Sequence, residues 1–188
     1  MKSGIAGKIL AAALLLGAGS AVAASRHAAP APQTDSDIAR RIAHEVAMYP
    51  RYSIWDAVDV QVTNGQAQLS GAVNQPFKKD DIERIVKEVP GVVGVADQVK
   101  VLPLSPIDDQ LRLRLARAIY GDPTLSRYAG LAAPPIHILV ENGHVTLDGV
   151  VSNEMEKNIA GIRASGAGMS FGPVVNNLVV ENPPARKS

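Results

Sequence analysis

The chain has 188 residues, with 19 Lys and Arg, 18 Asp and Glu, and no Cys. The near balance of charges leaves no clustered excess of Lys and Arg for binding nucleic acid, and the absence of Cys excludes disulfides and thiolate metal sites. Stability must therefore come from packed cores, and the length suffices for one ordinary domain or two small ones.

The first 23 residues have the pattern of a secretory signal peptide. Lys2 and Lys8 precede an apolar run over residues 9–18, and Ala21-Val22-Ala23 supplies a small-residue cleavage pattern. The run is short for a membrane span, which takes roughly 20 apolar residues. We therefore expect a periplasmic protein cleaved near Ala23, without a transmembrane span; an uncleaved anchor is the alternative. No Cys follows the cleavage pattern, so a lipoprotein is not expected.

One motif occurs twice. The chain reads VTNGQAQLSGAV over residues 62–73 and LVENGHVTLDGVV over residues 139–151. An Asn-Gly pair between alternating apolar residues favours a two-residue β-hairpin turn, here at Asn64-Gly65 and Asn142-Gly143. Alternation then places the shared apolar residues on one buried face. Gly71 and Gly149 lie on that face, where we expect a helix to pack closely against the backbone.

Helix patterns flank each hairpin. Apolar residues four apart mark a helix before it, and these residues are Ile38, Ile42 and Val46 in the first copy and Leu111, Leu115 and Ile119 in the second. Asp35 or Ser36 is the expected cap of the first helix, and Asn153 with Glu156 opens the helix after the second hairpin. A further strand, GVADQVKVL or GPVVNNLVVE, ends each unit.

Each unit therefore reads α-β-β-α-β. We place the units at residues 35–102 and 107–181 and a short linker at 103–106. Residues 24–34 and 182–188 are rich in Ala, Pro and polar residues, so we expect a flexible lead and a disordered tail.

The order of elements and the motif V-x-V-x-N-G-x-V-x-L-x-G-x-V resemble the BON domain. Nearly the whole chain after the signal peptide takes part in the resemblance. The residues that carry it are Asn64, Gly65, Leu69, Gly71, Val73, Gly91, Val92, Val95 and Val99, and Asn142, Gly143, Val145, Leu147, Gly149, Val151, Val174, Asn176, Asn177 and Leu178.

The resemblance implies an α+β fold in which each unit is a small three-stranded mixed sheet with two helices on one face. It further implies an envelope protein of the periplasmic, osmotically inducible type, which binds phospholipid or membrane surfaces and performs no catalysis. The second copy departs in its glycine-rich second helix, in Pro173, and in the longer loop GDPTLSRYAGLAAPP. These departures leave open whether both copies bind the same thing.

Residues for catalysis or metal binding are not grouped in the sequence. No His, Asp and Glu cluster has metal-ligand spacing, and Ser residues lack the G-x-S-x-G pattern. His137 and Asp148 face each other across the second predicted hairpin, which is more typical of a solvated cross-strand pair than of an active site. We therefore predict a protein that is not an enzyme and uses no cofactor.

The outer face of the second copy's first helix is the predicted binding surface. It combines Leu113 and Tyr120 with Arg112, Arg114 and Arg117. Arginine pairs with phosphate while Leu and Tyr enter the apolar boundary of a bilayer, so this composition suits a lipid headgroup interface. The alternative is that Leu113 and Tyr120 pack against the other copy or the long loop.

Trp55 is the only Trp in the chain. It is a second candidate anchor at a membrane interface, although covering the edge of the first core is the more usual role. The sequence thus predicts a non-enzymatic periplasmic protein that binds anionic phospholipid and supports envelope integrity or osmotic-stress tolerance. The alternative is a scaffold that binds another envelope protein.

Overall fold

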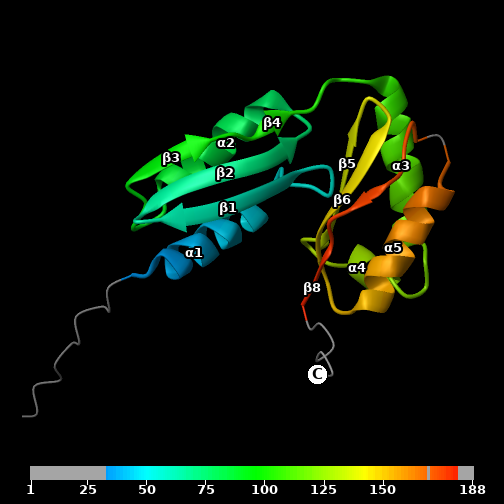
Figure 1. The fold of residues 1–188 in the computed structure, drawn as a ribbon. Helices are drawn as coiled ribbons and strands as arrows, with labels where there is room; N and C mark the ends of the chain where they lie inside the picture. The colour runs from blue at the N-terminus through cyan, green and yellow to red at the C-terminus, as the bar shows by residue number, and fades with distance from the viewer. Residues whose placement is uncertain (1–32, 169, 182–188) are drawn as a thin grey trace, which may run out of the picture. The chain divides into compact units, whose positions relative to one another are not determined.

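The first unit consists of two helices and a hairpin with a third, interrupted strand (Figure 1). The computed structural model describes residues 33–168 and 170–181, so the predicted signal peptide and C-terminal tail lie outside the described residues. The elements of the first unit are α1 (Asp35–Met48), β1 (Ala57–Thr63), β2 (Gln66–Val73), α2 (Pro76–Lys87), β3 (Gly94–Asp97) and β4 (Lys100–Val101).

The second unit repeats this order with one insertion. Its elements are α3 (Pro106–Tyr120), α4 (Ser126–Ala129), β5 (Ile136–Glu141), β6 (His144–Val151), α5 (Glu154–Gly166), β7 (Val175–Asn176) and β8 (Val179–Val180). The short helix α4 lies in the long loop and has no counterpart in the first unit. The predicted α+β fold class, with two repeated units, is confirmed.

The helices begin at capping side chains. Thr34, rather than Asp35 or Ser36, caps α1, because its hydroxyl accepts from the Asp37 backbone N–H in a capping box. In α5 the predicted cap is confirmed, since the Asn153 side chain accepts from the Glu156 N–H at 3.0 Å. Capping satisfies backbone donors that have no partner within the helix.

The hairpins have the predicted register. Thr63 lies opposite Gln66 and Glu141 lies opposite His144, on either side of the two Asn-Gly turns. Asn64 and Asn142 both have φ of 51°, as a type I′ turn requires. The prediction that a helix packs closely against Gly71 and Gly149 is wrong, because the close neighbour of each glycine is another segment. A Cβ at Gly71 would lie 2.2 Å from the Ala57 carbonyl oxygen, so the first strand and not a helix excludes a side chain.

Gly149 repeats this close approach in the second unit. A Cβ there would lie 1.9 Å from the Pro135 carbonyl oxygen, and the residue has φ of 120°. The backbone at this point therefore takes a conformation that favours glycine.

The third strand of each unit is interrupted rather than continuous. β3 and β4 both pair parallel to β2, and β7 and β8 both pair parallel to β6. Between the segments, the Asp97 carboxylate accepts from the Val99 N–H at 2.8 Å, and Asn176 accepts from Leu178 in the same way at 3.3 Å. The interruption turns Val99 and Leu178 into the cores.

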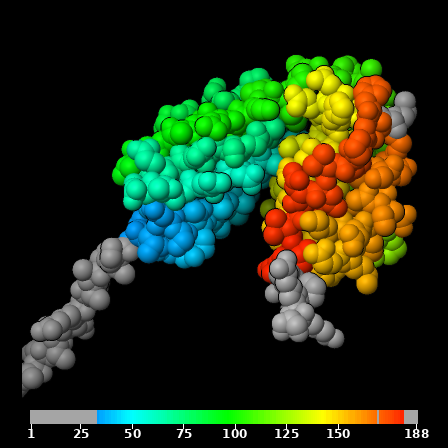
Figure 2. Space-filling model, in the orientation of Figure 1, coloured from blue at the N-terminus to red at the C-terminus, as the bar shows by residue number. Residues whose placement is uncertain are grey.

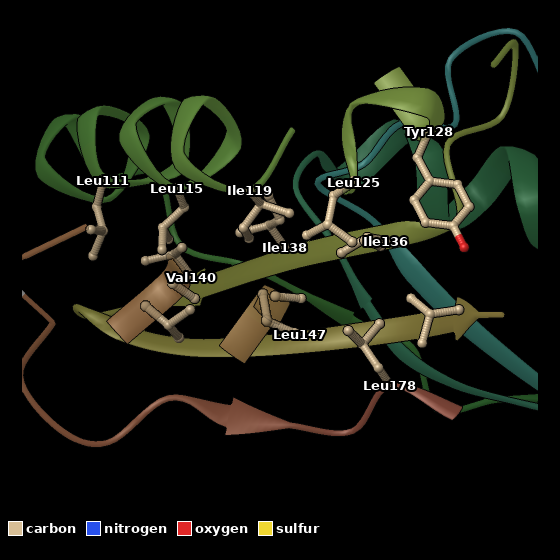
Figure 3. Close-up of a cluster of buried hydrophobic side chains, with 14 residues drawn as sticks. Leu111, Leu115, Ile119, Leu125, Tyr128, Ile136, Ile138, Val140, Leu147 and Leu178 are labelled. Atoms are coloured by element: carbon tan, nitrogen blue, oxygen red, sulfur yellow. The ribbon is translucent and has the colours of Figure 1, made fainter. Parts of the chain in front are cut away.

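Each sheet has its two helices on one face, with the core between the layers (Figure 1). Figure 3 shows Leu111, Leu115 and Ile119 pointing from α3 toward the sheet of the second unit. Leu125 and Tyr128, from the long loop and α4, extend this core. The insertion is therefore part of the second core. In Figure 2 the last described segment (red) runs beside α5 (orange).

Residues 52–55 contact the second unit. The Ile138 N–H donates to the Ile54 carbonyl at 2.6 Å, and Ile54 and Trp55 pack against the second core. The sequence favours a structural role for Trp55 at the edge of the first core. The structure shows Trp55 packed against the second core instead.

Candidate functional site

An open groove lies beside the C-terminal half of α3. Its volume is about 440 Å³. Its lining is mostly apolar and consists of Ile54, Ala116, Arg117, Tyr120, Gly121, Ala129 and Pro134. Among the described residues, no helix is long and apolar enough to cross a membrane.

Leu113 and Arg117 are the predicted site residues that α3 presents to solvent. Leu113 is 50 % exposed, and Arg117 is exposed at the rim of the groove. They are four residues apart, so they are neighbours on one face of the helix. Arg117 forms no ion pair with any residue that the structure describes, whereas Arg127 pairs with Glu156 and Arg163 with Asp122.

Arg112 does not flank this outer face, contrary to the prediction. It is 5 % exposed, and its guanidinium donates to the Val140 carbonyl at 2.6 Å and to Asp109. The side chain reaches around the helix to β5, whose outer edge is not paired with another strand. Arg112 therefore closes part of that edge.

Tyr120 also turns toward β5 rather than outward with Leu113. Its hydroxyl donates to the Ile136 carbonyl, and its ring packs against the second core while one side lines the groove. Burial raises the pKa of this hydroxyl above its usual value. Tyr120 therefore packs against the core of its own domain, which is neither the predicted outward placement nor the alternative of packing only on the other copy or the long loop.

The two remaining candidates are half-buried. Arg114 lies on α3 with part of its side chain covered, and Trp55 packs against the second core. Both keep some exposed surface, but neither lines the groove.

A carboxylate from the first helix holds each Asn-Gly turn, which the sequence reasoning missed. Asp35 accepts from the N–H groups of Asn64 and Gly65 at 2.7 and 2.9 Å. Asp108 accepts from Asn142 and Gly143 at 2.9 and 2.8 Å. The available signal was an Asp three residues before the apolar stripe in both units. All six residues of the predicted turn and glycine motif thus have structural roles.

His137 and Asp148 lie opposite each other on β5 and β6, as predicted. The His137 ring also lies beside the Tyr52 ring, tilted by 53° with ring centroids 5.4 Å apart, and its Nδ1 lies 3.3 Å from the Ser53 carbonyl oxygen. Burial lowers the pKa of His137 and raises that of Asp148. Within residues 33–168 and 170–181, no three His, Cys, Asp or Glu residues group as metal ligands.

The family follows from the repeated unit. The BON domain matches residues 34–103 and again residues 108–182. The chain belongs to the BON-domain family. BON domains are non-catalytic binding domains of envelope-associated proteins, and they bind membranes or proteins. A role of the phospholipid-binding, envelope-associated type is therefore supported at the level of the family.

Two solved structures of the CdsD protein of Chlamydia trachomatis, a structural protein of the type III secretion system, are similar to this BON-domain chain. One has 17 % identity and a TM-score of 0.27, and covers 79 % of this chain and 94 % of its own. The other, the C-terminal domain, has 18 % identity and a TM-score of 0.28, and covers 78 % and 98 %. No curated protein matches the chain.

Proposed function

We propose that this protein binds anionic phospholipid surfaces in the periplasm through the second BON domain, and thereby supports envelope integrity or osmotic-stress tolerance. The observation that carries the proposal is the outer surface of α3. There the Arg117 guanidinium stands at the rim of an apolar groove, one turn from half-exposed Leu113. A cation beside apolar surface is the composition that binds at the boundary between headgroups and acyl chains.

The proposed contact site contains fewer residues than the set predicted from the sequence. Leu113 and Arg117 are the contact residues, and Arg114 and Trp55 stay candidates at its margin. Arg112 and Tyr120 act from beneath, because their polar atoms bond to β5 and hold α3 in place. Changing either of them would disturb the fold and the surface together.

The first BON domain lacks the same surface. Counting from the two turn-binding aspartates, Arg40 stands where Leu113 stands, and His44 where Arg117 stands. Arg40 already pairs with Asp37. The first helix thus offers no apolar side chain at this position, and the proposal places lipid binding in the second domain.

Co-sedimentation with vesicles tests the proposal. We expect binding to phosphatidylglycerol vesicles that weakens with added salt, and much weaker binding to phosphatidylcholine. Arg117→Gln should lose about 1 kcal/mol, roughly fivefold in affinity, as for one basic residue near an anionic surface. Leu113→Ser should weaken binding as well, since it removes apolar contact.

Arg40→Gln is the matched control, because it removes one positive charge from the equivalent helix of the first domain. It should leave binding nearly unchanged. Equal losses from Arg40→Gln and Arg117→Gln would indicate attraction by net charge alone. Absence of vesicle binding at low salt would overturn the proposal, and retention of envelope proteins by the same surface would then favour the interaction scaffold.

A further inference from the structure

The outer edges of the two sheets differ in how many of their backbone groups are hydrogen-bonded. β5 and β1 are equivalent edge strands, each paired on one side only, with β6 and β2. Along β5, the Ile136 carbonyl accepts from Tyr120, the Ile138 N–H donates to Ile54, and the Val140 carbonyl accepts from Arg112. At three successive outward positions of β5, a backbone group is thus already hydrogen-bonded to another residue of the same chain.

The equivalent groups of β1 are open. The Val58 N–H donates to the Tyr52 hydroxyl at 3.1 Å, outside the hairpin, so the groups of Val60 and Val62 point the same way by strand alternation. Outside the hairpin, no residue in the described part of the chain bonds to the backbone of Val60 or Val62. Two residues of β1 therefore present free donors and acceptors at a sheet edge.

The reason lies in the helix beside the edge. Counted from Asp35 and Asp108, the positions of Arg112 and Tyr120 in α3 are occupied in α1 by Ala39 and Ala47. Alanine cannot reach the strand. β1 itself, AVDVQVT, also lacks the Lys, Pro or bulge with which proteins usually block an exposed edge.

We propose that β1 pairs with β1 of a second copy of this protein, as antiparallel strands related by a two-fold axis at Gln61. In this register Val60 faces the partner's Val62, and Val62 faces the partner's Val60. The four hydrogen bonds so formed use the open groups of β1 and leave the Val58 N–H with Tyr52. The sheets of the two copies then become one continuous sheet.

The side chains of β1 are compatible with this register. Asp59, the only charged residue of the strand, faces the partner's Thr63, so no like charges lie opposite each other. Gln61 faces the partner's Gln61 on the exposed side, where two amides can bond to each other. Such self-complementarity is what a two-fold interface requires.

Single cysteines test the register, because the natural chain has none. At the axis, Gln61→Cys places two Cα atoms about 4.5–5.5 Å apart, within reach of a disulfide. Thr63→Cys is the matched control on the same exposed face, since the two residues 63 lie about 13 Å apart along the paired strands. We expect a disulfide-linked dimer under mild oxidation from Gln61→Cys and little from Thr63→Cys.

A second variant closes the edge. Ala39→Arg with Ala47→Tyr copies into α1 the two side chains that cover β5. Light scattering should show the natural chain doubling in mass as concentration rises and this variant staying a monomer, with a circular dichroism spectrum like that of the natural chain. A natural chain that stays monomeric at the highest attainable concentration, or equal cross-linking at positions 61 and 63, would overturn the proposal.

Discussion

The two BON domains bury side chains of opposite charge at the same position. Lys78 in α2 and Glu156 in α5 each stand five residues after the end of the hairpin's second strand, and each is almost fully covered. Lys78 pairs with Asp56 at 2.6 Å. Glu156 pairs with Arg127 at 2.6 Å and accepts from Tyr128. Each pair fastens the second helix to the segment before the first strand.

The difference shows what the fold requires at this position. It requires a bonded partner across the end of the core, while the sign of the charge is free. In the second domain that partner comes from the inserted loop with α4, which supplies Arg127 and Tyr128. Burial raises the pKa of Glu156. Hydrogen bonds from Tyr128, Ser152 and Arg127 lower it by more, so the pKa lies below its usual value.

The largest effect is expected from breaking the pair in the first domain. Asp56→Ala leaves the buried Lys78 ammonium without its carboxylate, with only the Ser53 hydroxyl at 3.3 Å as a partner, and it also leaves the Asn74 N–H without its acceptor. We expect the free energy of unfolding to fall by roughly 3–5 kcal/mol. Hydrogen exchange of β2 and β6 amides separates the two domains, and the loss should be confined to β2.

Asp56→Leu with Lys78→Met is the control for this pair. It removes both charges, so it should recover most of the stability lost in Asp56→Ala. A double variant as unstable as the single one would show that packing or the lost acceptor of the Ser53 and Asn74 N–H groups, and not the unpaired charge, explains the loss.

A smaller effect distinguishes the two carboxylates under the turns. Asp108→Asn replaces one acceptor oxygen with a donor facing the N–H groups of Asn142 and Gly143, so we expect a loss of about 1.5–3 kcal/mol. Asp35→Asn should cost less, because Asp35 is half-buried whereas Asp108 is 1 % exposed. Denaturant unfolding measures both, and the reverse order would contradict the dependence on burial.

The smallest effect is a pH dependence confined to the second hairpin. Burial keeps the pKa of His137 below 6.5, so the unfolded chain takes up a proton first as the pH falls. The free energy of unfolding should therefore decrease on acidification through about pH 6.5, while the raised pKa of Asp148 acts in the opposite direction near its own range. Nearby Asp56 reduces the shift of His137 without reversing it.

His137→Gln removes this titration. Unfolding of the variant between about pH 7.5 and 5.5 should show a flatter stability profile than that of the natural chain. His144→Gln, which replaces an exposed histidine on the same hairpin, serves as the matched control. An unchanged slope in His137→Gln would assign the pH dependence to another group.

Local features were predictable. The Asn-Gly turns set the register because both central residues adopt positive φ, and apolar residues four apart marked the buried stripes of α1 and α3. The interrupted third strands were not predicted, although Asp97 and Asn176 bond to the backbone two residues on in a way typical of Asx turns.

Of the residues in the predicted binding face of α3, Leu113 and Arg117 are exposed, whereas Arg112 and Tyr120 turn toward β5 instead of outward. A helical wheel gives the angle at which a side chain leaves the helix, but not how far a long side chain bends back. The polar ends of Arg112 and Tyr120 donate to carbonyls on the unpaired edge of β5. Their direction depended on a strand that lies far from α3 in the sequence.

The sequence by itself determined the repeat, the hairpins and the inner faces, because turn chemistry and periodicity act over a few residues. It thereby determined the family. The tertiary structure alone decided which arginine is left at the surface, where Trp55 packs, and which sheet edge is covered. Those outcomes depend on contacts between segments distant in the chain, where one alanine or one tyrosine on a helix leaves a strand open or closes it.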